Sequence, residues 1–167
     1  MTRFYSVELD NRDRGSFVCG NDKIDHYFQC VIKQDVKRDY AACYVLVERE
    51  SERLAGFYTL SSSGVPLTEL PPELVRKLPR YPSVPAVLIG WLARDRSFAG
   101  EGVGTLLLYD AFTRLSRSPV GAYAVFVDAI DEKAIAFYRS FGFISFSNRS
   151  SSLFLPLATI RSLVAES

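Results

Sequence analysis

The sequence predicts an α/β protein in which helices flank a mixed β-sheet, and three observations favour this class. Short runs rich in β-branched and aromatic residues alternate with segments whose apolar residues recur at helical spacing. Residues 84–93 form the most continuously apolar run, which is typical of a central strand covered on both faces. The chain has 167 residues and is 48% hydrophobic, enough for one core. We therefore predict a single domain over residues 1–167.

The first predicted elements are a strand, a helix and a hairpin. Residues 4–9 have the composition of a strand, and Asn21 or Asp22 can cap the helix that follows. Apolar residues between Ile24 and Val36 recur at helical spacing, so one face of this helix packs against the core. Residues 40–48 and 53–61 flank a polar turn, which predicts an antiparallel hairpin.

The second half of the chain continues the alternation after a proline-rich connection. Prolines crowd residues 66–85, which leaves room for one short helix at residues 73–78. The strand at residues 84–93 leads to a helix that begins near Val103, and another buried strand covers residues 120–129. Asp131 can cap a third helix, and Gly142 is placed to end it in a left-handed turn. A final pair of strands is expected at residues 143–146 and 153–157.

Composition narrows the function classes. The formal net charge is +1, so no global basic field indicates nucleic acid, and a polyanionic partner would need a local patch. Cys19, Cys30 and Cys43 are widely spaced and only His26 could join them, so neither a disulfide framework nor a metal site is predicted. The first residues lack the apolar core of a signal peptide, and no stretch is long and apolar enough to span a membrane. We expect a cytoplasmic protein without a membrane partner.

A glycine-rich stretch carries the first functional signal. Residues 99–104 read Ala-Gly-Glu-Gly-Val-Gly, between the strand at residues 84–93 and the helix from Val103. Glycines let the backbone approach a ligand, and the start of a helix presents free N–H groups and a positive dipole end to an anion. The loop therefore predicts a phosphate site.

Two common phosphate-binding motifs do not fit this loop. A dinucleotide fold needs Gly-x-Gly-x-x-Gly, whereas the spacing here is Gly-x-Gly-x-Gly. A Walker loop needs Gly-Lys followed by Ser or Thr, but Thr105 follows Gly104 directly, with no lysine between them. The remaining candidate ligand for this loop is the diphosphate of another coenzyme.

Two motifs at the right separation resemble the GNAT superfamily of acetyl-CoA-dependent N-acetyltransferases. Its pyrophosphate loop, Arg/Gln-x-x-Gly-x-Gly/Ala, is matched over residues 99–104 except at Ala99. Its Ala-x-x-Phe/Leu-Tyr-x-x-x-Gly-Phe helix is matched at Ala134, Phe137, Tyr138, Gly142 and Phe143. The resemblance implies a mixed, mostly antiparallel sheet with splayed central strands flanked by helices, and a single GNAT domain that uses acetyl-CoA.

The resemblance narrows to the TacT-like toxin branch of toxin–antitoxin systems and covers nearly the whole chain. It rests on residues 17–20 with Ile24 and Asp25, on residues 55–61, and on residues 78–86. The branch implies acetylation of the α-amine of an aminoacyl-tRNA, which blocks translation. It also implies a ribbon-helix-helix antitoxin as a partner that neutralises the toxin and helps to repress their promoter.

The chain departs from this branch beside the implied coenzyme site. Trp91 and Arg94 stand where the branch commonly has Arg and Val, and Ala99 and Glu101 stand where it has Gln and Lys. Because a glycine loop binds phosphate chiefly through backbone N–H groups, we expect Ala99 and Glu101 to weaken coenzyme binding rather than abolish it. The sequence offers no reason for Trp91.

The resemblance also assigns roles to individual residues. Tyr138 is implied to be the general acid for the departing thiolate, and Asp131 lies roughly where many relatives have a coenzyme-contacting Asn. We name no general base, because the α-amine of an aminoacyl ester is acidic enough to react without one. The residues implied to bind coenzyme A are Leu92, Ala93, Arg94, Gly100, Glu101, Gly102, Val103, Gly104, Thr105 and Phe137.

An RNA substrate would need a local group of cations. The candidate cations are Arg76, Lys77, Arg80, Lys33 and Lys37. Two other functions stay open: a GNAT acting on a small amine or a protein amino group, which the near-neutral charge favours, and a non-catalytic acyl-CoA-binding or antitoxin-docking module. The sequence also leaves open the preferred tRNA and the oligomeric state, a homodimer included.

Overall fold

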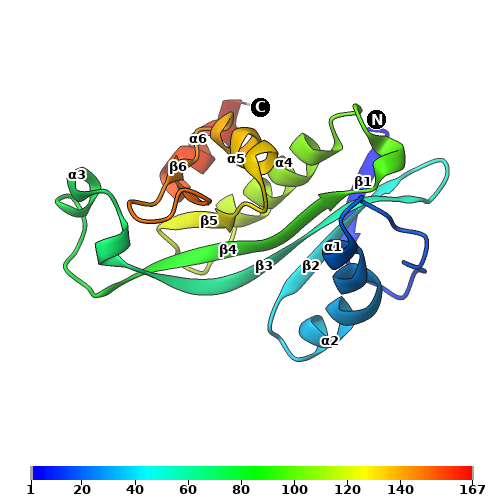
Figure 1. Cartoon of the computed structure of the whole chain (residues 1–167), viewed down its shortest axis with the longest axis horizontal. Helices are drawn as coiled ribbons and strands as arrows, with labels where there is room; N and C mark the ends of the chain where they lie inside the picture. The colour runs from blue at the N-terminus through cyan, green and yellow to red at the C-terminus, as the bar shows by residue number, and fades with distance from the viewer. Residues whose placement is uncertain (1, 167) are drawn as a thin grey trace. The chain divides into compact units, whose positions relative to one another are not determined.

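A computed structural model describes residues 2–166 and divides into two compact units. The first unit runs to Ser61 and includes Gly90–Ala111, and the second comprises Ser62–Ile89 and the chain from Phe112. Over these described residues, the sheet has seven strands in the order β1-β2-β3-β4-β5-β7-β6 (Figure 1). Most neighbouring strands are antiparallel, which confirms the predicted mixed α/β class.

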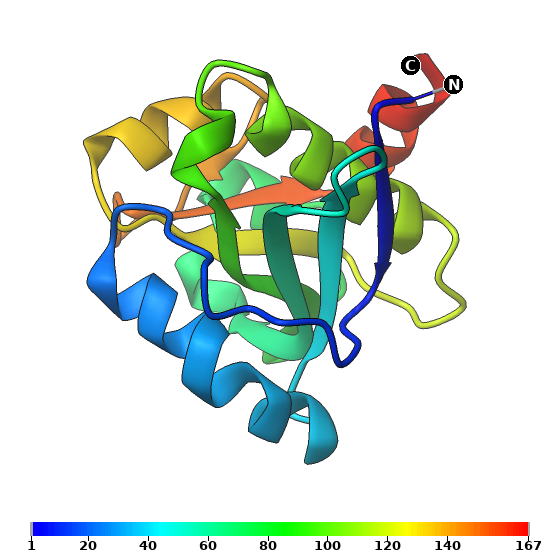
Figure 2. The same ribbon diagram turned by 90° about the vertical axis from the view of Figure 1, so that its right-hand side faces the viewer.

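The first unit contains the predicted hairpin. Strand β1 (Phe4–Glu8) pairs antiparallel with β2 (Ala42–Glu48), and β2 pairs antiparallel with β3 (Leu54–Pro66). Figure 2 shows β1, in dark blue, beside this hairpin. The register shifts between Leu46 and Val47, which is the mark of a β-bulge. Strand β3 is longer than the strand predicted over residues 53–61, since its alternating pattern continues to Pro66.

The predicted N-terminal helix is present but contains a π-helical turn. It comprises α1 (Asp22–His26), a π-helix at Tyr27–Val31 and α2 (Ile32–Lys37), beside β2 in Figure 1. Asn21 is the cap, because its side-chain oxygen accepts the Ile24 N–H at 3.1 Å. The N–H of Ile32 donates to the Tyr27 carbonyl, five residues back, and this widened turn was not predicted.

Aromatic packing holds this helix on the sheet within the first unit. The ring of Phe28 stacks on Phe57 of β3, with centroids 4.1 Å apart, and Phe17 meets both rings edge-on. Each fully buried aromatic or aliphatic side chain of this size contributes about 1.5–3 kcal/mol to folding. The buried members of this core are Phe17, Ile24, Tyr27, Phe28, Ile32, Cys43, Val45, Val47, Phe57 and Ala93.

Strand β4 (Ser83–Arg94) carries the chain to the glycine loop, as predicted for the apolar run. A 3-10 turn (Arg96–Phe98) and helix α4 (Val103–Ser116) follow. Leu107 of α4 packs so closely on β3 that a Cβ at Gly56 would lie 2.7 Å from its Cδ1, and 2.8 Å from the Ala93 carbonyl oxygen. Gly56 therefore sets the spacing between α4 and the sheet.

The second unit contains a parallel strand pair and a C-terminal antiparallel ladder. Residues Ala86–Ile89 of β4 pair parallel with Ala124–Val127 of β5 (Ala124–Asp128). Strand β5 pairs antiparallel with β7 (Ser152–Pro156), which pairs with the short β6 (Ile144–Ser145). The strand predicted over residues 120–129 is thus too long, because residues 120–123 lie outside β5.

Among the helices of the second unit, α5 begins where it was predicted, whereas α3 and α6 differ from the prediction. Helix α5 (Glu132–Arg139) begins as predicted, because Asp131 accepts the Ala134 N–H at 2.8 Å, and Gly142 beyond its end has a φ of 96°. The proline-rich connection holds a 3-10 turn (Leu67–Glu69) and α3 (Pro72–Val75), which starts and ends earlier than residues 73–78. Helix α6 (Leu157–Glu166) was not predicted.

We expect Gly56→Ala to lower the free energy of unfolding by about 1–3 kcal/mol, because the added methyl group must displace Leu107 or the backbone of β4. Gly121→Ala is the matched control, since nothing lies within 4 Å of a Cβ there. Urea denaturation monitored by circular dichroism measures both variants. A Gly56→Ala protein as stable as Gly121→Ala would contradict the close approach.

Candidate functional site

The glycine loop has the backbone geometry that a phosphate cradle requires. Gly100 and Gly102 have φ values of 78° and 75°, a region that favours glycine over residues with a side chain. No atom lies within 4 Å of a Cβ built at either position, so both face open space. The loop is closed on itself by a hydrogen bond of 3.3 Å from the Glu101 N–H to the Phe98 carbonyl.

Helix α4 begins where the loop ends and leaves amide donors at its start. The N–H of Leu106 donates to the Gly102 carbonyl at 3.1 Å, which is the first bond of the helical ladder. The preceding amides of Val103, Gly104 and Thr105 have no carbonyl four residues back within the helix, as at any helix N-terminus. Such amides and the helix dipole attract anions. The predicted cradle exists, and its coenzyme role stays a prediction.

Asp95 fixes the turn between β4 and the glycine loop. Its Oδ1 accepts the Ser97 N–H at 2.9 Å and the Ser97 hydroxyl at 2.6 Å, and its Oδ2 accepts the Val18 N–H at 3.1 Å. The residue is 6% exposed. Burial by itself would raise the pKa of Asp95, but the bonds from Ser97 and Val18 outweigh it, so the pKa is lowered. Asp95 was not among the predicted site residues, although an Asp whose side chain bonds to the backbone two residues on is a typical turn signal.

The last residue of β4, Arg94, carries a buried hydrogen-bond donor for which no described residue supplies an acceptor. Leu92, Ala93 and Arg94 are the last residues of the strand, which then turns at Asp95 with a backbone bond of 2.8 Å to Ala55. Within residues 2–166, the Arg94 Nε is buried and has no hydrogen-bond partner. An unsatisfied buried donor is costly and is commonly matched by a ligand acceptor.

Trp91 has a structural role that the sequence did not reveal. Its indole stacks on the Tyr27 ring, with centroids 4.1 Å apart and planes 8° from parallel. The Tyr27 hydroxyl donates to the Asp35 carboxylate at 2.8 Å, and the backbone N–H of Trp91 donates to the Thr59 hydroxyl at 3.1 Å. Trp91 thus joins β4 to the π-helical turn, in the strand that ends at Arg94.

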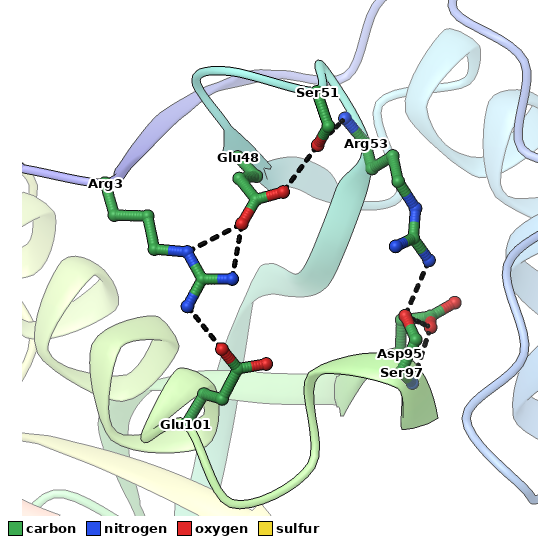
Figure 3. A network of polar contacts seen from close by, with 7 residues as sticks. All are labelled: Arg3, Glu48, Ser51, Arg53, Asp95, Ser97 and Glu101. Atoms are coloured by element: carbon green, nitrogen blue, oxygen red, sulfur yellow. Dashed lines mark hydrogen bonds and ion pairs between the residues drawn. The ribbon is translucent and has the colours of Figure 1, made fainter.

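The carboxylate of Glu101, in the glycine loop, is held by Arg3, the residue directly before β1. Figure 3 shows the Arg3 guanidinium between the carboxylates of Glu101 and Glu48. On the other side of the hairpin, Arg53 donates to the Ser97 hydroxyl at 2.6 Å, next to Asp95. The charge of Glu101 is therefore compensated within the first unit.

The predicted proton donor lies in α5 of the second unit. Tyr138 is 7% exposed, and its ring contacts Phe137 and Phe143 at centroid distances of 5.2 and 5.3 Å. Burial raises the pKa of Tyr138, so the phenol keeps its proton at neutral pH. Its hydroxyl has no hydrogen-bond partner among the described residues. Asp131 acts as the cap of the same helix, through its bond to Ala134.

The five candidate RNA-binding cations are all exposed. Lys33 and Lys37 lie on α2 in the first unit, whereas Arg76, Lys77 and Arg80 follow α3 in the second. None of the five forms an ion pair with another described residue, although Lys33 donates to Asn11. Their charges are available to phosphates, and their role stays a prediction.

The donors of the first unit fit a coenzyme that carries a diphosphate. The cradle offers backbone amides and two glycines open to a ligand. Its one carboxylate, on Glu101, is paired with Arg3. In the described part of the chain, no three His, Cys, Asp or Glu side chains are grouped as a metal site, and no helix is long and apolar enough to cross a membrane.

Comparisons with known proteins agree with this geometry. Residues 7–143 match the Acetyltransferase (GNAT) family. The chain is 31% identical to the "Probable toxin TacT" of Sinorhizobium fredii, covering 95% of this chain and 92% of that protein. It is 30% identical to a "tRNA-acetylating toxin" of Mycobacterium tuberculosis, covering 94% and 93%.

Solved structures share the fold over nearly the whole chain. A tyrosine-to-phenylalanine mutant of KacT has a TM-score of 0.89 and 30% identity, covering 97% of this chain and 99% of that one. AtaT complexed with acetyl-methionyl-tRNAfMet has a TM-score of 0.87 and 28% identity, covering 96% and 98%. An AtaT mutant bound to acetyl-CoA and the C-terminus of the antitoxin AtaR has a TM-score of 0.81 and 27% identity, covering 97% and 98%.

We expect Asp95→Asn to lower the free energy of unfolding by about 1–3 kcal/mol at pH 7, because an amide nitrogen would face the donors of Ser97 or Val18. Since the folded pKa is lowered, the contribution of the carboxylate is present above its unfolded pKa of about 4 and is lost as the pH falls further. Urea denaturation at pH 7 and pH 3 should show a difference that narrows in acid. The exposed Asp13→Asn is the control, and a gap that widens in acid would contradict this account.

Proposed function

We propose, because this chain belongs to the Acetyltransferase (GNAT) family, that it is a toxin that acetylates the α-amino group of an aminoacyl-tRNA and so blocks translation. The observation that carries the proposal is similarity along almost the full chain to proteins named as tRNA-acetylating toxins. The fold shared with AtaT, which was solved with acetyl-methionyl-tRNAfMet, supports the same substrate class. The family makes the chain an acetyl-CoA-dependent N-acetyltransferase. The cytoplasm, where tRNA is aminoacylated, is the expected place of action.

The first unit supplies the proposed coenzyme site. Bound acetyl-CoA would supply the acetyl group as an activated thioester. Amides from Gly100 to Thr105 would hold its diphosphate, and the backbone of Leu92, Ala93 and Arg94 would pair with its pantetheine. The Nε of Arg94, which lacks an acceptor among the described residues, is the side-chain donor available at this strand end. Holding the thioester at a fixed position brings it within reach of the amine and removes much of the entropic barrier.

Tyr138 is the proposed general acid. Acyl transfer from a thioester releases a thiolate, which is a better leaving group once it is protonated. A phenol whose pKa is raised by burial is protonated at neutral pH and has a proton to donate. Phe137, the residue before Tyr138 in α5, is the residue of this helix that we assign to coenzyme contact. No general base is assigned to the amine.

The exposed cations are the proposed contacts to the tRNA backbone. The net charge of the chain is +1, so attraction to a polyanion has to come from local groups such as Arg76, Lys77 and Arg80. Lys33 and Lys37 on α2 form the second group. We further propose a ribbon-helix-helix antitoxin as the neutralising partner, in line with the AtaT structure that contains the C-terminus of an antitoxin.

The near-neutral charge is the specific observation that favours a second candidate, acetylation of a small amine or a protein amino group. The experiment that separates the two candidates incubates the protein with radiolabelled acetyl-CoA and total aminoacylated tRNA. Label should enter charged tRNA and should be absent when the tRNA is first deacylated. Label that enters only proteins or small amines would refute the tRNA substrate. Measurable coenzyme A binding without any acetyl transfer would indicate a non-catalytic module.

We expect Tyr138→Phe to retain its fold and its affinity for coenzyme A while turnover falls by about a hundredfold or more, since only the proton donor is removed. Tyr123→Phe is the control, because it removes the hydroxyl of another tyrosine of the second unit, one that is only partly buried. Acetylation rates and calorimetric binding separate the two effects. A fully active Tyr138→Phe protein would remove this residue from the mechanism.

We expect Arg76→Glu with Lys77→Glu to weaken tRNA acetylation by about tenfold or more at low salt, while coenzyme A affinity is unchanged. The control with the same change of charge is Arg117→Glu with Arg161→Glu, both exposed positions of the second unit. The salt dependence of KM for charged tRNA measures the number of phosphate contacts. Equal loss in both double variants would refute a localised patch.

A further inference from the structure

Glu101 is an unfavourable residue for an anion-binding loop. It lies between Gly100 and Gly102, whose φ values place the loop backbone in the left-handed region, and two residues before the first residue of α4. A carboxylate there adds a negative charge among the amides that would receive a diphosphate. Its repulsion opposes the attraction of the helix N-terminus.

Arg3 neutralises this charge and is itself fixed by other groups. Its guanidinium pairs with Glu101, and its Nε donates to Glu48 Oε2 at 2.6 Å (Figure 3). The same guanidinium lies over the rings of Phe4 and Phe98, 5.0 and 5.7 Å from their centroids. Glu48 is oriented in turn by Ser51, whose hydroxyl donates to it at 2.5 Å. Arg3 is therefore held on the β2 side even without Glu101.

We propose that Arg3 is a positioning residue for the coenzyme: it holds the Glu101 carboxylate and cancels its charge, so that the amides of the glycine loop can accept a polyanionic ligand. The inference rests on the proposed function of this loop. Arg3 acts through Glu101 and is not assigned any contact with the coenzyme.

A role in stability does not explain the pair. The side chains of Arg3 and Glu101 are 51% and 32% exposed, and ion pairs this accessible contribute little to folding. Their effect on a highly charged ligand is larger, because the loop residues lie within one Debye length of the carboxylate at physiological salt. Two phosphate charges at about 8 Å from one unpaired carboxylate lower the binding constant by about fivefold in a water-like dielectric.

A double-mutant cycle tests the proposal. The four proteins are wild type, Arg3→Ala, Glu101→Gln and the double variant, and the measurement is the dissociation constant of coenzyme A by isothermal titration calorimetry at low salt. We expect Arg3→Ala to weaken binding by about fivefold, and Glu101→Gln to bind at least as tightly as wild type. In the Glu101→Gln background, Arg3→Ala should weaken binding clearly less than it does in wild type, because no loop carboxylate is left to be released. The loss caused by Arg3→Ala alone should shrink at high salt.

Two further variants give the controls. Arg49→Ala removes the same charge from a neighbouring residue. The Arg49 side chain bonds to the Thr2 carbonyl and lies over the Tyr5 ring, so the affinity for coenzyme A should be unchanged. Arg3→Lys keeps the charge and should restore most of the affinity. Circular dichroism melting curves verify that each variant is folded.

The outcomes separate this inference from the proposed function. If Arg3→Ala weakens binding equally in the Glu101→Gln background, Arg3 acts directly on the ligand or on the fold, and the inference is wrong. An unchanged dissociation constant for Arg3→Ala would also overturn it, while the proposed function would stand. Wild-type protein that fails to bind coenzyme A would overturn both.

Discussion

The carboxylate of Asp95 is the constraint from which the candidate coenzyme site is built. It ends β4, caps the 3-10 turn through Ser97 and ties that turn to the backbone at Val18. The direction in which the chain leaves β4 is thereby set, and Gly100, Gly102 and the first amides of α4 follow within a few residues. A buried carboxylate that accepts three hydrogen bonds is a stable way to hold such a turn, because each bond compensates part of its desolvation. The cradle itself can then consist of glycines.

The departures of this chain from the toxin branch have separate physical explanations. Trp91 stacks on the ring of Tyr27. Glu101 is compensated by Arg3, which directly precedes β1. Arg94 adds a donor that no described residue accepts from. Trp91 and Glu101 are thus matched by contacts in the fold, which agrees with a working coenzyme site. Ala99 has no such explanation in the structure.

Features whose signal is local could be predicted from the sequence. The cap at Asp131, the left-handed Gly142, the hairpin and the glycine loop before α4 were predicted because each depends on residues a few positions apart, and Asn21 was one of the two residues predicted to cap the first helix. The interactions it missed join distant parts of the sequence, as in the pairs Arg3 with Glu101 and Tyr27 with Trp91. Helix α6 was missed because it starts at Leu157 directly after β7, with no separate cap residue between the two elements. The roles proposed for Tyr138 and Phe137 came from family resemblance, since a buried aromatic pair on a helix is by itself typical of a core.

The π-helical turn at Tyr27–Val31 determines which way the side chains after it face. A π turn is equivalent to one additional residue inserted into a regular helix, and each residue of an α-helix advances the helix by about 100°. Every side chain beyond Val31 is rotated by that amount relative to an uninterrupted helix, and Asp35 in this setting meets the Tyr27 hydroxyl. If the same residues formed an uninterrupted α-helix, the helix would be more regular, yet Asp35 would turn away and leave the tyrosine beneath Trp91 without its acceptor. The local irregularity is therefore what aligns Asp35 with Tyr27.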